Sequence, residues 1–245
     1  GIVLIALMWS WEGADMRPME LFADAGNMAS FIDGFFPPEF HEWPLYLSEM
    51  VVTLKIAVWG TALAVITAIP FGILSSENIA PWWVVQPIRR LMDTARAINE
   101  MVFAMLFVVA VGLGPFAGVL AIWISDVGNL SKLYSEAIEN IDRKQVEGVR
   151  ATGADPARII RYGYLPQIFP VFLSLSLYSF ESSTRSATIL GLVGAGGVGM
   201  IIIERFRAGM FDQVAFVVLN ILIVIAVIDW GSGLIRKRFI GERGH

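Results

Sequence analysis

Glu181 and Arg185 are the first candidates for chemistry in this sequence, because both charges lie within a mostly apolar stretch. Residues four apart on a helix share a face, so the two side chains can pair. A guanidinium also matches the oxygens of an oxyanion in bidentate geometry. Two interpretations stay open with about equal weight. The pair is structural, or Arg185, with Ser186 beside it, binds an anion.

A run of glycines follows these charges and matches the pattern G-x-G-x-x-G over 194–199. In a dinucleotide site this pattern follows a strand, opens a helix and precedes an acidic residue by about 20 positions. Here a long apolar run comes next, and Glu204 and Asp212 arrive too early. We therefore expect Gly194, Gly196 and Gly197 to allow close backbone packing or a re-entrant turn that lines a pathway.

Several catalytic chemistries lack their residues. The chain has no cysteine, and its two histidines are His41 and His245, so neither a thiolate nor a histidine metal site is expected. No lysine precedes a serine or threonine, so the phosphate loop G-x-x-x-x-G-K-[ST] is absent. We expect no cofactor in this chain and no ATP hydrolysis by that loop.

The composition points to lipid as the solvent for much of the surface. The 245 residues are 56% hydrophobic and 16% charged, and the mean hydropathy is +0.65. Soluble domains are about 45–50% apolar and about 25% charged. A net charge of −4 without a basic cluster also argues against nucleic acid.

Apolar runs long enough for a bilayer, about 20 residues, predict the elements that carry these side chains. We expect one all-α membrane domain over 1–245, with six crossings. The first is a truncated span ending near Trp9, and the others cover roughly 46–75, 88–111, 115–138, 166–188 and 212–231. A turn at 112–115 must separate the third and fourth crossings, since proline does not continue a helix and glycine permits the turn.

Charge placement predicts the topology, because Lys and Arg of short loops stay on the cytoplasmic side. The segment 11–44 is acidic and contains Arg17 as its one base, so we expect it outside the cytoplasm. Three basic sets share the cytoplasmic side: Arg89, Arg90 and Arg96; Lys132, Arg143, Lys144, Arg150, Arg158 and Arg161; and Arg236, Lys237, Arg238 and Arg243. Both ends of the chain are then cytoplasmic, and Arg205 and Arg207 violate the rule locally.

The cytoplasmic loop 139–165 is long for a connection between two membrane helices. Its sequence predicts a helix over 145–154 that ends near Gly153, a residue that tolerates positive φ. A second helix starts at Asp155, a favourable N-cap, followed by Pro156. We expect a helix–turn–helix elbow, although a solvated connector is the plainer alternative.

This loop resembles the EAA loop of ABC importer permeases, with Glu147, Gly153, Leu165 and Pro166 at the matching positions. Gly148 and Val149 replace the two alanines, and Gly163 replaces the isoleucine. The segments 111–118, 146–153 and 185–199 resemble the permease subunits of phosphonate and phosphite importers. The resemblance covers about 45–240. The methionine importer permease is similar over the glycine-rich stretch.

The resemblance implies a type I ABC importer fold and a bacterial inner-membrane protein. Its partners would be a second copy of the chain, two ATPase subunits that bind ATP and Mg, and an extracytoplasmic solute-binding protein. The coupling residues toward the ATPase would be Glu147, Gly148, Arg150, Ala151, Thr152, Gly153, Ala154 and Asp155. The translocation path would contain Glu181, Arg185, Ser186, Gly194, Gly196 and Gly197.

Three alternatives remain open. The solute could be methionine or another small molecule instead of a phosphorus oxyanion. A membrane-embedded hydrolase would need a nucleophile with a base, or paired acids, within the spans, and the sequence offers neither. A channel or ion-driven carrier has no need of the elbow and commonly has internal repeats, which are absent from the sequence.

Overall fold

The computed structural model describes residues 1–14, 19, 25–40 and 42–240, and the regular structure of these residues is helical. The helices are α1 (Ile2–Gly13), α3 (Ala25–Asp33), α4 (Trp43–Leu74), α5 (Trp82–Ala97), α6 (Glu100–Val111), α7 (Pro115–Glu139), α8 (Arg143–Ala151), α9 (Pro156–Ile159), the π-helix η1 (Ile160–Tyr164), α10 (Leu165–Gly191), α11 (Val198–Arg207) and α12 (Phe211–Ile240). The predicted all-α fold is confirmed.

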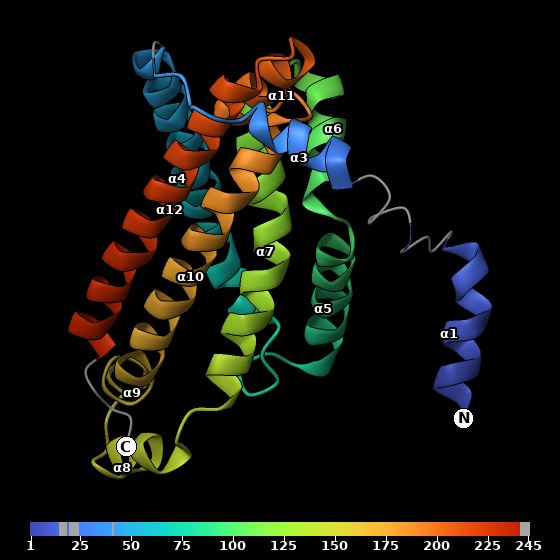
Figure 1. Cartoon of the computed structure of the whole chain (residues 1–245). Coiled ribbons are helices and arrows are strands. Elements are labelled where there is room, and N and C mark those ends of the chain that lie inside the picture. The colour runs from blue at the N-terminus through green and yellow to red at the C-terminus, as the bar shows by residue number, and fades with distance from the viewer. Residues whose placement is uncertain (15–18, 20–24, 41, 241–245) are drawn as a thin grey trace.

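Four long helices form the body of the molecule: α4, α7, α10 and α12 (Figure 1). The shorter α5 and α6 follow one another along a flank, beside α7. At one end of the bundle α8 projects outward, and at the opposite end α3 and α11 lie across the helix termini. The helix α1 lies apart from the bundle in this view.

Small residues bring α4 against α7. Gly60, Ala64, Ala68 and Gly72 recur every fourth position and are buried, so they form one face of the helix. A Cβ on Gly60 would come within 2.7 Å of Ile122, and one on Gly72 within 2.7 Å of Tyr134. Stripes of small residues allow membrane helices to approach at backbone distance. This contact fixes α7 at the centre of the fold.

Two helices are long and apolar enough to cross a membrane, Trp43–Leu74 and Phe211–Arg238, and the pair α5 and α6 makes a third if it is one span. The helices α7 and α10, predicted as crossings at 115–138 and 166–188, have matching bounds but are more polar. Their serines at 125, 131, 135, 179 and 183 are buried within the bundle. Helices that bury polar side chains against one another need less apolar surface overall.

The prediction of one helix over 88–111 is wrong. The structure breaks it between Ala97 and Glu100 and bends the two parts by 85°. Ile98 is extended, and the Asn99 side chain accepts a hydrogen bond from the Met101 backbone N–H at 2.9 Å, which caps α6. This N-cap satisfies a backbone donor at the new helix start. The turn predicted at 112–115 is confirmed, with positive φ at Gly112 and Gly114.

Acidic residues before α4 pair with Arg205, one of the two bases that depart from the predicted charge topology. A guanidinium nitrogen of Arg205, on α11, lies 2.6 Å from a carboxylate oxygen of Glu42. The neighbouring Glu39 accepts a hydrogen bond from Gln213 at 2.9 Å. The base is therefore neutralised within its own end of the bundle. Asp15, Arg17, Glu20 and Asp24 of the acidic segment lie outside the described residues.

Candidate functional site

The elbow, residues 143–164, contains the two short helices that the sequence predicts. Asp142 caps α8 by accepting from the Lys144 backbone N–H at 2.9 Å. The helix ends before Gly153, whose φ is +76°. Asp155 then accepts from the Arg158 backbone N–H at 3.3 Å at the start of α9. Each break in the elbow thus has a residue suited to it.

The helix α8 is held at two points, one on α10 and one on η1. The Gln167 side chain accepts from the Asp142 backbone N–H at 2.9 Å, so the start of α8 is held to the first turn of α10. Gly163 lies against Val146, where an added Cβ would be 3.3 Å from the Val146 Cα. From Pro156 to Gly191 every residue is helical, through α9, η1 and α10. A displacement of α9 therefore reaches α10 without an intervening loop, and α8 joins this path through its contacts with Gln167 and Gly163.

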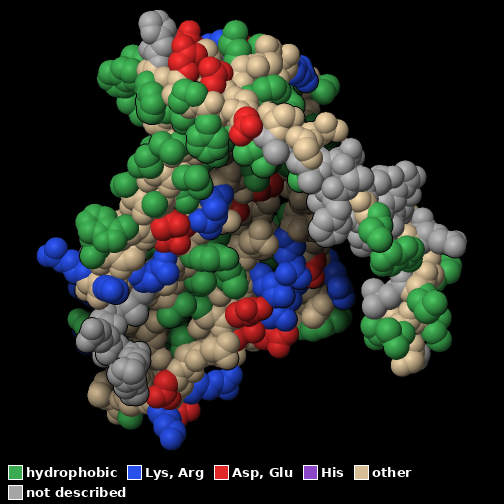
Figure 2. Space-filling view, viewed as in Figure 1, with side chains coloured by type: hydrophobic (Ala, Val, Ile, Leu, Met, Phe, Trp, Pro, Cys, Tyr) green, Lys and Arg blue, Asp and Glu red, His purple; other side chains and the backbone are tan. Residues whose placement is uncertain are grey.

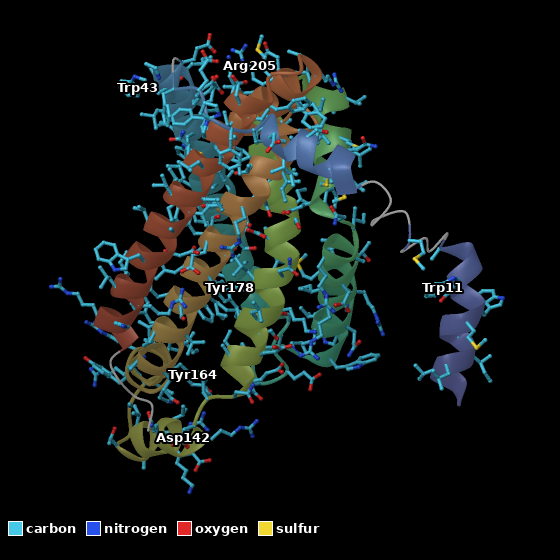
Figure 3. All side chains as sticks on the ribbon, in the orientation of Figure 1. Trp11, Trp43, Asp142, Tyr164, Tyr178 and Arg205 are labelled. Atoms are coloured by element: carbon cyan, nitrogen blue, oxygen red, sulfur yellow. The ribbon has the colours of Figure 1, made fainter. Side chains whose placement is uncertain are left out.

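The eight predicted coupling residues lie together on the outer side of the elbow. Glu147, Gly148, Arg150, Ala151, Thr152, Gly153 and Asp155 are exposed, and Ala154 is half-buried. Among the described residues Glu147 and Arg150 form no ion pair. A groove of about 400 Å³ beside them is lined by both residues, together with Arg143 and Tyr164. The elbow thus presents unpaired charges beside a concave surface, which suits a partner protein. Figure 3 shows Asp142 and Tyr164 at this end of the molecule.

The predicted pair of Glu181 with Arg185 is wrong. Glu181 lies 2.5 Å from Arg236, and Arg185 lies 3.5 Å from Asp229, so each residue pairs across to α12. The side chains of Arg185 and Asp229 are 45% and 46% exposed. An exposed pair costs less to separate than a buried one, because water replaces part of the interaction. Ser186 is half-buried on the same helix.

The glycine-rich stretch forms a compact turn at the far end of α10 from the elbow. Gly194, Gly196 and Gly197 have φ of +92°, +84° and +77°. The Gly194 carbonyl accepts from the Gly114 N–H at 3.0 Å. The Val198 N–H donates to the Thr53 hydroxyl at 2.9 Å. The turn is therefore joined to both the α6–α7 connection and α4. The turn follows the helix that carries Arg185, but these hydrogen bonds do not involve the Arg185–Asp229 ion pair.

Asp126, an acid in the middle of α7, is absent from the residues predicted to form the site. One carboxylate oxygen of Asp126 accepts hydrogen bonds from Ser179 at 2.8 Å and from Ser183 at 2.6 Å. Thr61 on α4 donates to Ser183 at 3.0 Å, which extends the network to a third helix. An ionisable residue inside a predicted span is a functional candidate by default. That rule, applied to the predicted crossing 115–138, would have found it.

The described residues include no group of three or more His, Cys, Asp or Glu that could hold a metal ion. His41 and His245 lie outside the described residues. The charged side chains of the face seen in Figure 2 are instead arranged as bases beside acids.

This chain is similar to a protein family, to named relatives and to solved structures. Residues 68–241 match the family described as the binding-protein-dependent transport system inner membrane component. A protein of Escherichia coli K12 named as a cryptic phosphonate transport system permease protein, PhnE1, is 69% identical over 122 residues, which cover 50% of this chain and 59% of that protein. The phosphite transport system permease protein PtxC of Stutzerimonas stutzeri is 32% identical over 98% of this chain and 86% of its own length.

Among solved structures, an inward-facing crystal form of the MetNI methionine ABC transporter superposes with a TM-score of 0.71. The match covers 82% of this chain and 99% of that chain at 18% sequence identity, so it establishes the fold and not the solute. The predicted type I importer fold is confirmed.

Proposed function

The chain belongs to the family of inner membrane components of binding-protein-dependent transport systems, and from this membership we propose that it is the permease of an ABC importer for phosphonate, phosphite or a related small phosphorus oxyanion. The named relatives that transport phosphonate and phosphite support this substrate class. The observation that carries the mechanism is the exposed elbow, which continues as helix into α10.

In this mechanism a separate ATPase pair binds ATP and Mg, and its closure moves the elbow. The exposed carboxylate and guanidinium of Glu147 and Arg150 contact the ATPase, while Gly148 and Ala151 allow close approach because their side chains are small or absent. Thr152, Gly153, Ala154 and Asp155 form the turn that transmits the movement into α10. The transporter contains two copies of this permease and receives its solute from an extracytoplasmic binding protein.

The translocation path of this mechanism follows α10. Arg185 exchanges Asp229 for the oxyanion as it passes, because a guanidinium binds phosphorus oxygens at two points. Glu181 keeps Arg236 in place, and Ser186 offers a hydroxyl beside Arg185. The turn of Gly194, Gly196 and Gly197 closes the path at the end remote from the elbow. In this topology the elbow and both termini are cytoplasmic, the segment 11–44 is outside, and 1–245 is one domain.

A charge reversal on the elbow tests the coupling role. Arg150→Glu should abolish ATP-driven uptake in proteoliposomes and reduce co-purification of the ATPase, while the thermal stability of the permease stays unchanged. Lys237→Glu is the matched control, because Lys237 is an exposed base near the same end of the bundle. Equal uptake by the Arg150→Glu transporter and the wild type would reject the role of the elbow.

The chain contains no cysteine, so a single introduced thiol can report its own side of the membrane. Thr152→Cys should react with a membrane-impermeant maleimide in inside-out vesicles and stay unlabelled in intact cells. Labelling only from the outer side would overturn the proposed topology.

Uptake by Arg185→Ala tests the path. This variant should assemble with its partners but lose most uptake of phosphonate and phosphite, whereas unchanged uptake rejects the role of Arg185. Binding assays on the partner solute-binding protein with phosphonate, phosphite, phosphate and methionine identify the solute. Uptake without any ATPase would favour a channel, and substrate turnover by the purified chain would favour an enzyme.

A further inference from the structure

A polar pocket of about 390 Å³ lies between α5, α7 and α10. It is separate from the elbow and from the glycine-rich turn. Its lining includes two bases and two acids, and it consists of Arg96, Asp126, Asn129, Leu130, Lys132, Leu133, Glu136, Tyr178, Ser179 and Ser182. In Figure 2 Lys and Arg side chains gather beside a recess in this face, and Figure 3 labels Tyr178 on α10. A recess with so many polar groups is suited to a small charged solute.

The two bases of the pocket keep donors available. Arg96 pairs with Asp93 at 2.8 Å, and Lys132 pairs with Glu136 at 3.7 Å. Both pairs lie within one helix and are at least one-third exposed, so they contribute little and exchange readily with a ligand. A guanidinium has five N–H donors and an ammonium has three. Arg96 and Lys132 can therefore bind the oxygens of an anion while they stay near their present partners.

Asp126 differs from the other charged groups of this pocket. Its hydrogen-bond partners are the uncharged hydroxyls of Ser179 and Ser183, and among the described residues it forms no ion pair. It lies near the middle of α7, far from either end of the bundle. A carboxylate held away from bulk water without a cation is costly. This wall of the pocket therefore favours a positively charged group from outside the chain.

The pocket is continuous with the path proposed along α10. Tyr178, Ser182 and Arg185 are spaced by four and three residues, so they share one face of that helix. Tyr178 and Ser182 line the pocket, and Arg185 lies one turn further toward the glycine-rich turn. A solute that leaves Arg185 in the direction of the elbow would reach the pocket next.

We propose that this pocket is a transit subsite for zwitterionic phosphonates, with the ammonium group at Asp126 and the phosphonate oxygens at Arg96 and Lys132. The inference rests on the proposed function and deepens it. A phosphonate without an amine gains the two bases but meets the uncompensated charge of Asp126. An aminoalkylphosphonate carries both charges on one molecule and satisfies both walls. The subsite therefore selects for the amine at a step after release from the binding protein.

The test compares 2-aminoethylphosphonate with ethylphosphonate, which lacks the amine. The complete transporter is reconstituted with its ATPase and binding protein, and uptake of each compound by Asp126→Asn is divided by that of the wild type. We expect the uptake of 2-aminoethylphosphonate to fall by at least about tenfold, corresponding to about 1.4 kcal/mol. The uptake of ethylphosphonate should change by less than twofold. The binding protein is the same in all assays, so its own preference cancels. The amide introduced by Asp126→Asn keeps an oxygen that accepts from the two serines, which preserves the local packing.

A second measurement removes the binding protein and the transport cycle. The detergent-purified complex of permease and ATPase is heated with a large excess of either compound. The aminoalkylphosphonate should raise its melting temperature by about 2–4 °C, ethylphosphonate should raise it less, and Asp126→Asn should abolish the difference. Glu204→Gln on α11 removes an exposed acid outside the pocket and should leave both results unchanged.

The two measurements separate the two failures. In one outcome the wild-type transporter imports no phosphonate, yet 2-aminoethylphosphonate raises its melting temperature and Asp126→Asn abolishes that increase. This outcome contradicts the proposed function and supports the subsite. Wild-type import with equal effects of Asp126→Asn on both compounds, or equal stabilisation by both, overturns the subsite. Asp126 would then be a structural acid held by its serines.

Discussion

Two turns of this molecule depend on glycine, and they do so for different reasons. At the elbow, Gly153 has a φ of +76°, but a Cβ there would meet nothing within 4 Å. In the turn after α10, a Cβ on Gly196 would lie 2.7 Å from the Pro115 backbone nitrogen. The elbow requires only a backbone conformation, whereas the glycine-rich turn also requires space. One turn leaves its surface open to a partner, and the other is occupied by the bundle itself.

Gly191→Ala should have the largest effect, because it tests space alone. Gly191 is helical, so alanine fits its conformation, but the added Cβ would lie 2.7 Å from the Gly199 Cα and 2.8 Å from the Gly196 carbonyl oxygen. Backbone atoms cannot rotate away, and overpacking of this kind costs about 3 kcal/mol. The measurement is the free energy of unfolding in a denaturing detergent titration. The control is Gly231→Ala on α12, where a Cβ meets nothing within 4 Å. A loss equal to that of the control would refute the packed turn.

Thr53→Val should have the second-largest effect on stability. It removes the hydroxyl that accepts from the Val198 N–H while it keeps the shape of the side chain. A buried donor without its acceptor costs about 2 kcal/mol. Amide hydrogen exchange at Val198 should accelerate in this variant. Thr53→Ser keeps the hydroxyl and should restore slow exchange. Equally slow exchange in Thr53→Val would mean that another group satisfies this donor.

Gly153→Ala should have a smaller effect, because it tests conformation alone. A left-handed backbone with a Cβ costs about 1 kcal/mol, and no contact is lost. Gly153→Asn should cost less than alanine, since asparagine adopts positive φ more readily. If Gly153→Ala destabilised the chain as much as Gly191→Ala, the two turns would not differ as described.

Asp155→Ala should have the smallest effect on stability. The carboxylate caps α9 by accepting from the Arg158 N–H at 3.3 Å, and its surroundings are exposed. Loss of such a cap costs about 0.5–1 kcal/mol. Hydrogen exchange at Arg158 should increase, and Asp155→Ser should restore its protection. An effect that spread into α7 would show that the elbow is packed more tightly than its exposure indicates.

Local signals predicted most of the long helices, the turn at 112–115 and the break within the elbow. Glycine and proline at 112–115 separated α6 from α7, and Gly153 with Asp155 separated α8 from α9. The break at 98–99 was not predicted, although Asn99 before Glu100 is an N-cap signal. The apolar run at 101–111 is too short to span a bilayer, so the prediction extended it through the polar residues 88–100 to reach spanning length. Hydropathy measures how apolar a window of residues is and carries little information on whether the helix axis bends within that window.

Pairing across helices was the part that the sequence could not supply. Glu181 and Arg185 fit an intrahelical pair, yet their partners Arg236 and Asp229 lie 55 and 44 residues away. Which face of α12 meets α10 depends on packing of the whole bundle. Asp126 shows the opposite case, since its position in a predicted span already marked it. The identity of the serines that hold it required the fold.

The unbroken helical path from Pro156 to Gly191 has a mechanical consequence. Helix α10 has 27 residues, and at 1.5 Å per residue it is about 40 Å long. A tilt of about 10° imposed at its root would displace the distal tip by about 7 Å by simple leverage on that length. Such a stroke exceeds the width of a small oxyanion. In the proposed mechanism, a modest rotation of the elbow would thereby be amplified, by geometry alone, into the opening of an aperture at the opposite end of the bundle.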